Sequence, residues 1–123
     1  YDDLLGEIDA FFETKIAAAQ DLGCRDIVLD VGIGFGKTAE QNMILIKNLE
    51  HFLRFGLPIL AGASRKSVIN FYSPSEIKDR LPGSLYLHLE SFRNGAQIIR
   101  THDVAEHAQM FRLENAMRKL AAW

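Results

Sequence analysis

The sequence of 123 residues contains little cysteine, little proline and no long apolar run. Its one cysteine, Cys24, cannot form an internal disulfide or a metal cluster by itself, which favours a reducing, cytoplasmic compartment. We expect Cys24, next to Gly23, to be a small packed side chain rather than a nucleophile. No apolar stretch approaches the roughly 20 residues of a membrane span, and the amino end lacks a basic segment followed by an apolar one. These absences predict a soluble protein with no membrane partner.

A strong charge of either sign is also lacking. The 16 acidic residues nearly balance the 14 Lys and Arg residues, and the formal net charge is -2. Such a chain has no general basic field that would attract nucleic acid. With 48% hydrophobic and 24% charged residues it has the balance of one globular domain. Because the helical pattern is already under way near Tyr1, we expect residues 1–123 to be a single partial domain.

Helical and strand patterns alternate along the chain. Apolar residues recur at helical spacing in four segments, and short apolar runs typical of buried strands lie between them. This alternation predicts an α/β fold in which helices connect parallel strands. Thr38 is expected to cap the second helix, with Gln41 as its capping-box partner. The expected helices are 2–20, 38–55, 83–94 and 104–120, and the expected strands are 27–29, 58–62 and 96–100.

Each predicted helix presents apolar residues to a core. The third helix is apolar on more than one side, which predicts that a second subunit covers it as well as its own core. The residues expected to face inward are Leu4, Leu5, Ile8, Phe11, Phe12, Ile16 and Ala19 in the first helix, Ile44, Leu45, Leu49, Phe52 and Leu53 in the second, and Val104, Ala108, Phe111 and Leu120 in the last.

Polar side chains follow all three predicted strands. Asp30 and a loop with three glycines come after the first strand, the segment 64–67 after the second and the segment 100–103 after the third. Parallel strands end at one edge of a sheet, where α/β proteins form their ligand sites. A carboxylate such as Asp30 is costly to bury alone, so it either caps its own loop or meets a polar ligand. The sequence predicts one site built from three loops.

Phe35 stands between two glycines of the first loop. Its ring either packs under the loop or offers a face to a flat ligand, and the sequence leaves both open. The spacing of these glycines fits neither of the two common phosphate-binding fingerprints. Taken alone, the loop is more typical of a structural turn.

The second and third polar segments contain four basic or titratable side chains that would meet on one rim: Arg65, Lys66, Arg100 and His102. Arg100 and His102 are two residues apart at a strand end, so their side chains are expected to point the same way. Such a cluster is typical of a site for phosphate, pyrophosphate or carboxylate. The other histidines have no such neighbours and are expected to be surface or packed side chains, and no metal ligand is predicted in this chain. These are His51, His88 and His107.

Four motifs follow one another along the chain: LDVGIGFGKT followed by Asn42, GASRKS at 62–67, RLPG at 80–83, and IIRTHDV ending at Val104. In these motifs and their order the chain resembles the carboxyl-terminal half of bacterial dihydropteroate synthases. One departure is Val31, where the family usually has proline. We expect this change to loosen the turn without removing a side chain that contacts a ligand. The resemblance implies an α/β fold that is the carboxyl-terminal half of a (β/α)8 TIM barrel, since a whole barrel needs about 250 residues.

The resemblance also implies a transferase of folate biosynthesis. The reaction would join 6-hydroxymethyl-7,8-dihydropterin pyrophosphate to p-aminobenzoate, giving 7,8-dihydropteroate and pyrophosphate. It would use Mg²⁺ on the pyrophosphate, held by the amino-terminal part of the family's barrel, and the protein would be a homodimer. The implied roles are pterin binding by Asp30, Phe35, Gly62 and Lys66, p-aminobenzoate binding by Phe35, Lys66 and Ser67, and pyrophosphate binding by Arg65, Arg100 and His102.

Two other interpretations stay open. A pterin-binding domain of a methyltetrahydrofolate-corrinoid methyltransferase shares the fold, but it would not need the basic segments at 64–67 and 100–103. The other interpretation is a half-barrel without activity, which we expect to hold for the isolated chain.

Overall fold

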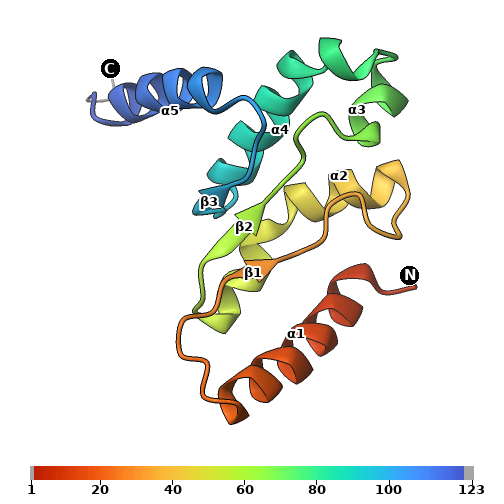
Figure 1. Ribbon diagram of the computed structural model, residues 1–123, viewed down its shortest axis with the longest axis vertical. Coiled ribbons are helices and arrows are strands. Elements are labelled where there is room, and N and C mark those ends of the chain that lie inside the picture. The colour runs from red at the N-terminus through yellow and green to blue at the C-terminus, as the bar shows by residue number, and fades with distance from the viewer. Residues whose placement is uncertain (1, 121–123) are drawn as a thin grey trace.

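The computed structural model describes residues 2–120, and a parallel sheet of three strands runs through it (Figure 1). The strands are β1 (Leu29–Asp30), β2 (Ile59–Ala61) and β3 (Ile98–Ile99), and they lie in the order β1-β2-β3. Leu29 pairs with Ile59, and Leu60 pairs with Ile98. Because the spatial order is the chain order and the strands are parallel, a helix must carry the chain back between neighbouring strands.

The helices follow the predicted alternation. Figure 1 shows α1 and α5 at opposite ends of the molecule, with the sheet, α2 and α4 between them. None of the helices within residues 2–120 has the length and hydropathy that crossing a membrane would require. The α-helices are α1 (Leu4–Asp21), α2 (Ala39–Lys47), α3 (Ser67–Tyr72), α4 (Leu81–Arg93) and α5 (Val104–Arg118), and the 3-10 helices are η1 (Leu49–Phe55) and η2 (Ile77–Asp79).

The predicted capping box at the start of α2 is confirmed. Thr38 Oγ1 accepts the Gln41 N–H at 3.1 Å, and Gln41 Oε1 accepts the Thr38 N–H at 2.9 Å. The helix expected over 38–55 is nevertheless broken at Asn48, whose side-chain amide donates to the Ile44 carbonyl at 2.8 Å. The chain continues from there as the tighter η1, so its side chains no longer follow the α-helical period.

The core fills the space between the sheet and the helices behind it. Leu45, Leu49, Phe52 and Ile59 are fully buried. Phe12 of α1 meets the Phe52 ring edge to face, with 5.6 Å between ring centroids. Each such side chain contributes about 1.5–3 kcal/mol through removal of its apolar surface from water. These contacts thus hold α1, which precedes β1, against η1, which precedes β2.

Several sequence predictions of burial are wrong. Cys24 is exposed, because Gly23 leaves α1 with a φ of 89° and turns the chain away from the core. The inward-facing sets were too broad, since each helix buries a narrower stripe than its apolar residues cover. The exposed fractions are 56% for Phe11, 41% for Ile44, 45% for Leu53, 67% for Val104 and 70% for Leu120.

The second and third predicted strands are in the right places but too long, and the first overlaps β1 only at Leu29. Each strand of the sheet comprises two or three residues, and β1 and β3 have one neighbour each. The segment between the predicted strand 58–62 and the predicted helix 83–94, for which the sequence predicts no helix or strand, contains α3 and η2. The predicted helix over 83–94 begins two residues earlier at Leu81, with Pro82 in its first turn, where a missing N–H costs nothing.

Candidate functional site

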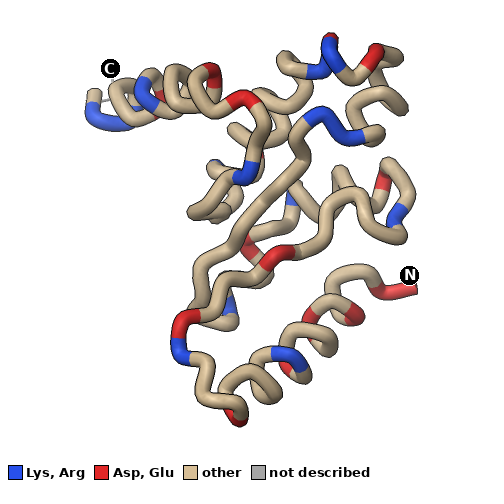
Figure 2. The backbone as a smooth tube through the Cα atoms, viewed as in Figure 1, with Lys and Arg blue, Asp and Glu red and all other residues tan. Residues whose placement is uncertain are grey.

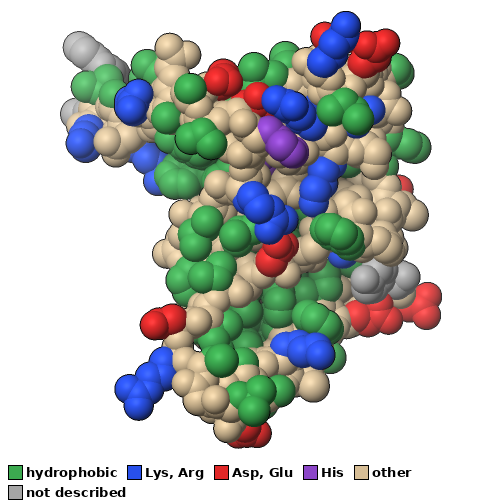
Figure 3. Space-filling view, in the orientation of Figure 1, with side chains coloured by type: hydrophobic (Ala, Val, Ile, Leu, Met, Phe, Trp, Pro, Cys, Tyr) green, Lys and Arg blue, Asp and Glu red, His purple; other side chains and the backbone are tan. Residues whose placement is uncertain are grey.

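The three polar segments meet at the carboxyl edge of the sheet, as the sequence predicts. Figure 2 shows an acidic residue at the end of β1 and basic residues just past β2 and β3, and Figure 3 shows basic and histidine side chains gathered on this face. The loops after β2 and β3 surround a hollow of about 170 Å³, called here the basic pocket. Its lining residues are Gly62, Ser64, Lys66, Arg100, Thr101 and His102.

Of the two roles that the sequence left open for Asp30, the structure shows the cap of its own loop. Its Oδ1 accepts the Gly32 N–H at 2.9 Å, so the carboxylate caps its own loop. Its Oδ2 lies 3.2 Å from Arg100 Nη1, which ties the end of β1 to the end of β3 across the middle strand. The carboxylate is 38% exposed, so it remains accessible to a polar ligand.

The loop that contains Gly32, Gly34 and Gly36 is called here the glycine loop, and it is fixed by hydrogen bonds within itself and by one from α2. Lys37 Nζ donates to the Gly32 carbonyl at 2.8 Å and to the Phe35 carbonyl at 3.0 Å. Asn42 Oδ1 accepts the Gly34 N–H at 2.8 Å. Burial lowers the pKa of Lys37, while Asp30 opposes that shift. The loop is therefore fixed by hydrogen bonds before any ligand arrives.

Lys66 bridges the loop after β2 and the glycine loop. Its ammonium donates to the Ile33 carbonyl and lies 4.8 Å from the centroid of the Phe35 ring. Burial, and after it Arg100, lowers the pKa of Lys66. The Phe35 side chain is 67% exposed, so it offers a face rather than packing under the loop. Gly34 has a φ of 89°, and a Cβ there would lie 3.0 Å from Lys66 Cδ, which explains the glycine.

Arg65 is a predicted site residue that does not line the basic pocket. Its guanidinium donates two hydrogen bonds to the Asp103 carboxylate, from Nη2 at 2.7 Å and from Nε at 3.2 Å. This hydrogen bond lowers the pKa of Asp103 and raises that of Arg65. Arg65 has a φ of 56°, a left-handed conformation that costs about 1 kcal/mol. Ser84 and Arg80 hold it there, since its N–H donates to Ser84 Oγ and its carbonyl accepts from Arg80 Nη1.

His102 is oriented by Ser64. The two side chains lie 2.7 Å apart, from Ser64 Oγ to His102 Nδ1, and the same oxygen accepts the His102 backbone N–H at 3.1 Å. Thr101 Oγ1 is 3.3 Å from Ser64 Oγ. Two contacts to one hydroxyl fix the imidazole ring with Nδ1 toward the loop after β2.

Two further pockets have residues of the loop after β1 in their lining. One, of about 390 Å³, includes Asp30, Phe35 and Lys37 in its lining, and the Asp30–Arg100 contact separates it from the basic pocket. Another, of about 290 Å³, is lined in part by Lys37, Asn42 and Ser67. Apart from Arg65, every side chain or glycine predicted to bind a ligand lines one of the three.

The remaining histidines are surface or packed side chains, as predicted. His51 is partly buried and packs at 2.7 Å from Asp9 Oδ2. His88 and His107 are buried, and their rings contact each other. Within residues 2–120, no group of three or more His, Cys, Asp or Glu side chains is arranged to hold a metal ion.

Sequence reasoning missed the side chains that orient the others. These are Lys37, Asn42, Ser64, Thr101 and Asp103, each within five residues of a predicted site residue or inside its motif. Lys37 bonds carbonyls of its own loop, whereas Asn42, Ser64 and Asp103 bond partners in other segments. The sequence of one segment does not contain these partners, so only the folded arrangement reveals them.

Comparison with known proteins places the chain among pterin enzymes. A family model described as pterin binding enzyme matches residues 1–102. The bifunctional dihydropteroate synthase/dihydropteroate reductase of Helicobacter pylori is 42% identical over 119 residues, which are 97% of this chain and 31% of that protein. Dihydropteroate synthase of Escherichia coli K12 is 38% identical over 118 residues, 94% of this chain and 42% of that protein.

Comparison with solved structures gives the same family as comparison of sequences. The crystal structure of dihydropteroate synthase from Stenotrophomonas maltophilia matches with a TM-score of 0.94 at 34% identity, over 99% of this chain and 47% of that one. These relatives are TIM barrels, so the prediction of a partial (β/α)8 barrel with three parallel strands is confirmed. The chain spans between about a third and a half of the length of the relatives named here. Because the family model covers the glycine loop, the segment 64–67 and the end of β3, this chain belongs to the pterin binding enzyme family.

Proposed function

We propose that the full-length protein containing this chain is a dihydropteroate synthase. It would condense 6-hydroxymethyl-7,8-dihydropterin pyrophosphate with p-aminobenzoate to give 7,8-dihydropteroate and pyrophosphate. The observation that carries this proposal is the convergence of one carboxylate, Asp30, and two cations, Lys66 and Arg100, at one edge of the sheet. A dihydropteroate synthase from Xanthomonas albilineans, solved in complex with 7,8-dihydropteroate, matches this chain with a TM-score of 0.94 at 32% identity.

The pterin would bind between the glycine loop and the loop after β2. Asp30, preorganised by the Gly32 N–H, would accept hydrogen bonds from the amino-pyrimidine edge. Lys66, held by the Ile33 carbonyl, would donate to the polar ring atoms, and the exposed face of Phe35 would flank the flat rings. All three groups are already fixed by contacts within the chain, so little ordering is required on binding.

The departing pyrophosphate would lie in the basic pocket. As the carbon–oxygen bond at the exocyclic methylene breaks, its electron pair goes to pyrophosphate and negative charge grows there. Arg100 and His102 are fixed near that position by Asp30 and Ser64, so they stabilise the transition state more than the ground state. The amine nitrogen of p-aminobenzoate then bonds the methylene carbon and loses its proton. Ser67, at the start of α3, would bind the carboxylate of that substrate.

The remaining features of the proposal rest on the resemblance. As the resemblance implies, Mg²⁺ on the pyrophosphate would be held by the amino-terminal part of the barrel, which this chain does not cover. Residues 1–123 would be a single partial domain of a cytoplasmic homodimer. A groove between α4 and α5, with Leu85, Leu89 and Met110 in its lining, supports association through these helices.

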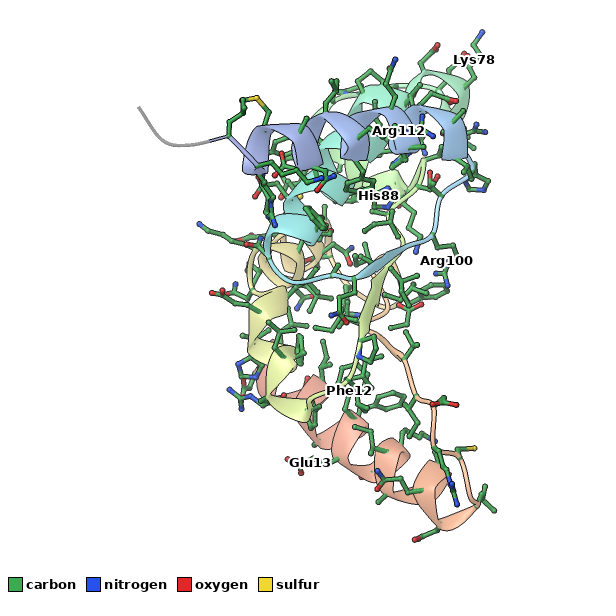
Figure 4. All side chains as sticks on the ribbon, turned by 90° about the vertical axis from the view of Figure 1, so that its left-hand side faces the viewer. Phe12, Glu13, Lys78, His88, Arg100 and Arg112 are labelled. Atoms are coloured by element: carbon green, nitrogen blue, oxygen red, sulfur yellow. The ribbon has the colours of Figure 1, made fainter. Side chains whose placement is uncertain are left out.

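Substitution of the two cations tests the proposal. In the full-length protein, Lys66→Ala and Arg100→Ala should each lower the rate of dihydropteroate formation at least about tenfold, or ~1.4 kcal/mol of transition-state stabilisation. Lys78→Ala and Arg112→Ala are matched controls, since both side chains are exposed and lie away from the basic pocket (Figure 4). Near-normal kinetics in both pocket variants would contradict the site. A wild type that makes no dihydropteroate would contradict the function and favour the corrinoid methyltransferase alternative.

A further inference from the structure

Two buried histidines behind the basic pocket have no part in the reaction proposed above. His88 of α4 is fully buried, and His107 of α5 is 3% exposed. His88 Nδ1 lies 2.7 Å from His107 Nε2, and the ring centroids are 4.8 Å apart (His88 is labelled in Figure 4). Two titratable rings buried against each other need defined proton positions, because a buried polar atom without a partner is costly.

The neighbouring backbone groups fix where the protons lie. The Ala63 backbone N–H can only donate, and it lies 2.8 Å from His88 Nε2, so that nitrogen carries no proton. Neutral His88 therefore has its proton on Nδ1 and donates it to His107 Nε2. Neutral His107 then has its own proton on Nδ1, which faces the Asp103 carbonyl at 2.8 Å. The bonds run in one direction, from Ala63 through both rings to Asp103.

The two ends of this chain of hydrogen bonds belong to different loops of the site. Ala63 lies between Gly62 and Ser64 in the loop after β2, and Asp103 follows His102 in the loop after β3. The contact from Ser64 Oγ to His102 Nδ1 spans the same two loops. The histidine pair therefore sets the distance between these two loops on the buried side, and the Ser64–His102 contact on the pocket side depends on that distance.

We propose that His88 and His107 are positioning residues for the basic pocket: as a neutral pair with both protons on Nδ1, they hold the loop after β2 against the loop after β3 and so set the place of His102. The inference rests on the proposed function only for the identity of the anion, pyrophosphate. If the two rings only filled space, their size would matter but the direction of their hydrogen bonds would not.

The charges around the pair agree with its neutral state. Burial lowers the pKa of His88 to about 4, with His107 and then Lys66 acting in the same direction. Asp103 follows on the far side of His107, and its carboxylate is already bound by Arg65. At neutral pH the His88 ring is thus uncharged, and because its Nδ1–H donates to His107 Nε2, that nitrogen carries no proton.

Two substitutions each remove only the central bond. In His88→Gln, Oε1 can still accept the Ala63 N–H, but no donor remains at the position of Nδ1. In His107→Asn, the amide can still donate to the Asp103 carbonyl, but no acceptor remains at the position of Nε2. If the pair acts as a unit, the double variant should lose no more than either single variant.

The readout is binding of inorganic pyrophosphate to the full-length protein, measured by titration calorimetry at pH 7.5. We expect each single variant and the double variant to bind pyrophosphate about threefold to tenfold more weakly, the effect of one hydrogen bond. Affinity for 6-hydroxymethyl-7,8-dihydropterin, which lacks the pyrophosphate, should stay within about twofold. His51→Gln is the matched control, since His51 is bonded to Asp9 outside the site. Equal losses for both ligands, or unchanged pyrophosphate binding, would overturn the positioning role.

Nitrogen NMR of the wild type with ¹⁵N-labelled histidine tests the proton positions without any variant. His88 and His107 should both be neutral with the proton on Nδ1 at pH 7, and a charged ring or an Nε2–H tautomer at either position would overturn the inference. Neither measurement depends on turnover. A protein that makes no dihydropteroate but shows the selective pyrophosphate effect refutes the proposed function alone, whereas normal turnover with unaltered pyrophosphate binding refutes the positioning role alone.

Discussion

His88 links the stability of the protein to pH. Its ordinary pKa is 6.5, and in the folded chain burial lowers it to about 4. The unfolded state therefore binds the proton more readily than the folded state between these values. The free energy of unfolding retains this contribution fully above pH 6.5, loses it as pH falls through the window, and changes no further below about pH 4. The whole contribution is at most about 3 kcal/mol.

Urea titrations of the wild type and His88→Gln between pH 7.5 and 4 measure this effect. The variant lacks the titrating group, so its free energy of unfolding should fall less than that of the wild type as pH drops from 6.5 to 4. Asp103, bound by Arg65, and Glu114, bound by Arg118, have lowered pKa values, so their contributions are lost at more acidic pH. Parallel pH profiles for the two proteins would show that His88 is not responsible.

Residues at strand ends could be predicted from sequence, whereas their partners could not. Asp30 and Arg100 directly follow apolar runs, and Lys66 lies in the polar segment that follows β2; parallel topology brings such positions to one edge. The hydrogen bonds of Arg65 with Asp103 and of His88 with His107 join residues 38 and 19 positions apart, and no local pattern encodes them. Arg65 was expected in the pyrophosphate site because of its charge, but its left-handed backbone turns it toward Asp103.

At the scale of elements, the capping box of α2 is a sequence signal that also supports the site. Thr38→Ala removes the acceptor of the Gln41 N–H and should lower the free energy of unfolding by about 1 kcal/mol. Denaturant titration measures the change. Thr14→Ala, at an exposed position inside α1, is the control and should have little effect. An unchanged midpoint in Thr38→Ala would mean that the cap does not stabilise α2.

The existence and order of the long elements followed from periodicity, but their bounds did not. The apolar pattern over 38–55 continues across Asn48, so nothing local marks the change from α2 to η1. Helix α3 has six residues, fewer than two turns, which is too short for a periodic signal. The strands are shorter than their apolar runs because pairing depends on the neighbouring strand, which the sequence of one segment does not contain.

At the scale of the whole molecule, the sheet is open at both edges: within residues 2–120, β1 and β3 each pair with one strand only. A complete barrel has eight strands and no edge. Beside β3, a hollow of about 520 Å³ is lined in part by Phe92, Ile99 and Phe111. The described residues thus provide one part of a closed sheet, and the basic pocket lies along the rim of that part.

This geometry predicts that the isolated 123-residue chain makes no measurable dihydropteroate, while the full-length protein does. Asp30, Lys66 and Arg100 form one wall of the proposed site, and the chain spans only 31–47% of the relatives compared above. Effective catalysis requires the reacting groups to be enclosed and aligned, and one wall cannot align two substrates. Dihydropteroate formation is assayed for both proteins, with circular dichroism to establish that the isolated chain retains its helices. Turnover by a folded isolated chain would refute the prediction and would mean that these three strands contain everything that the chemistry needs.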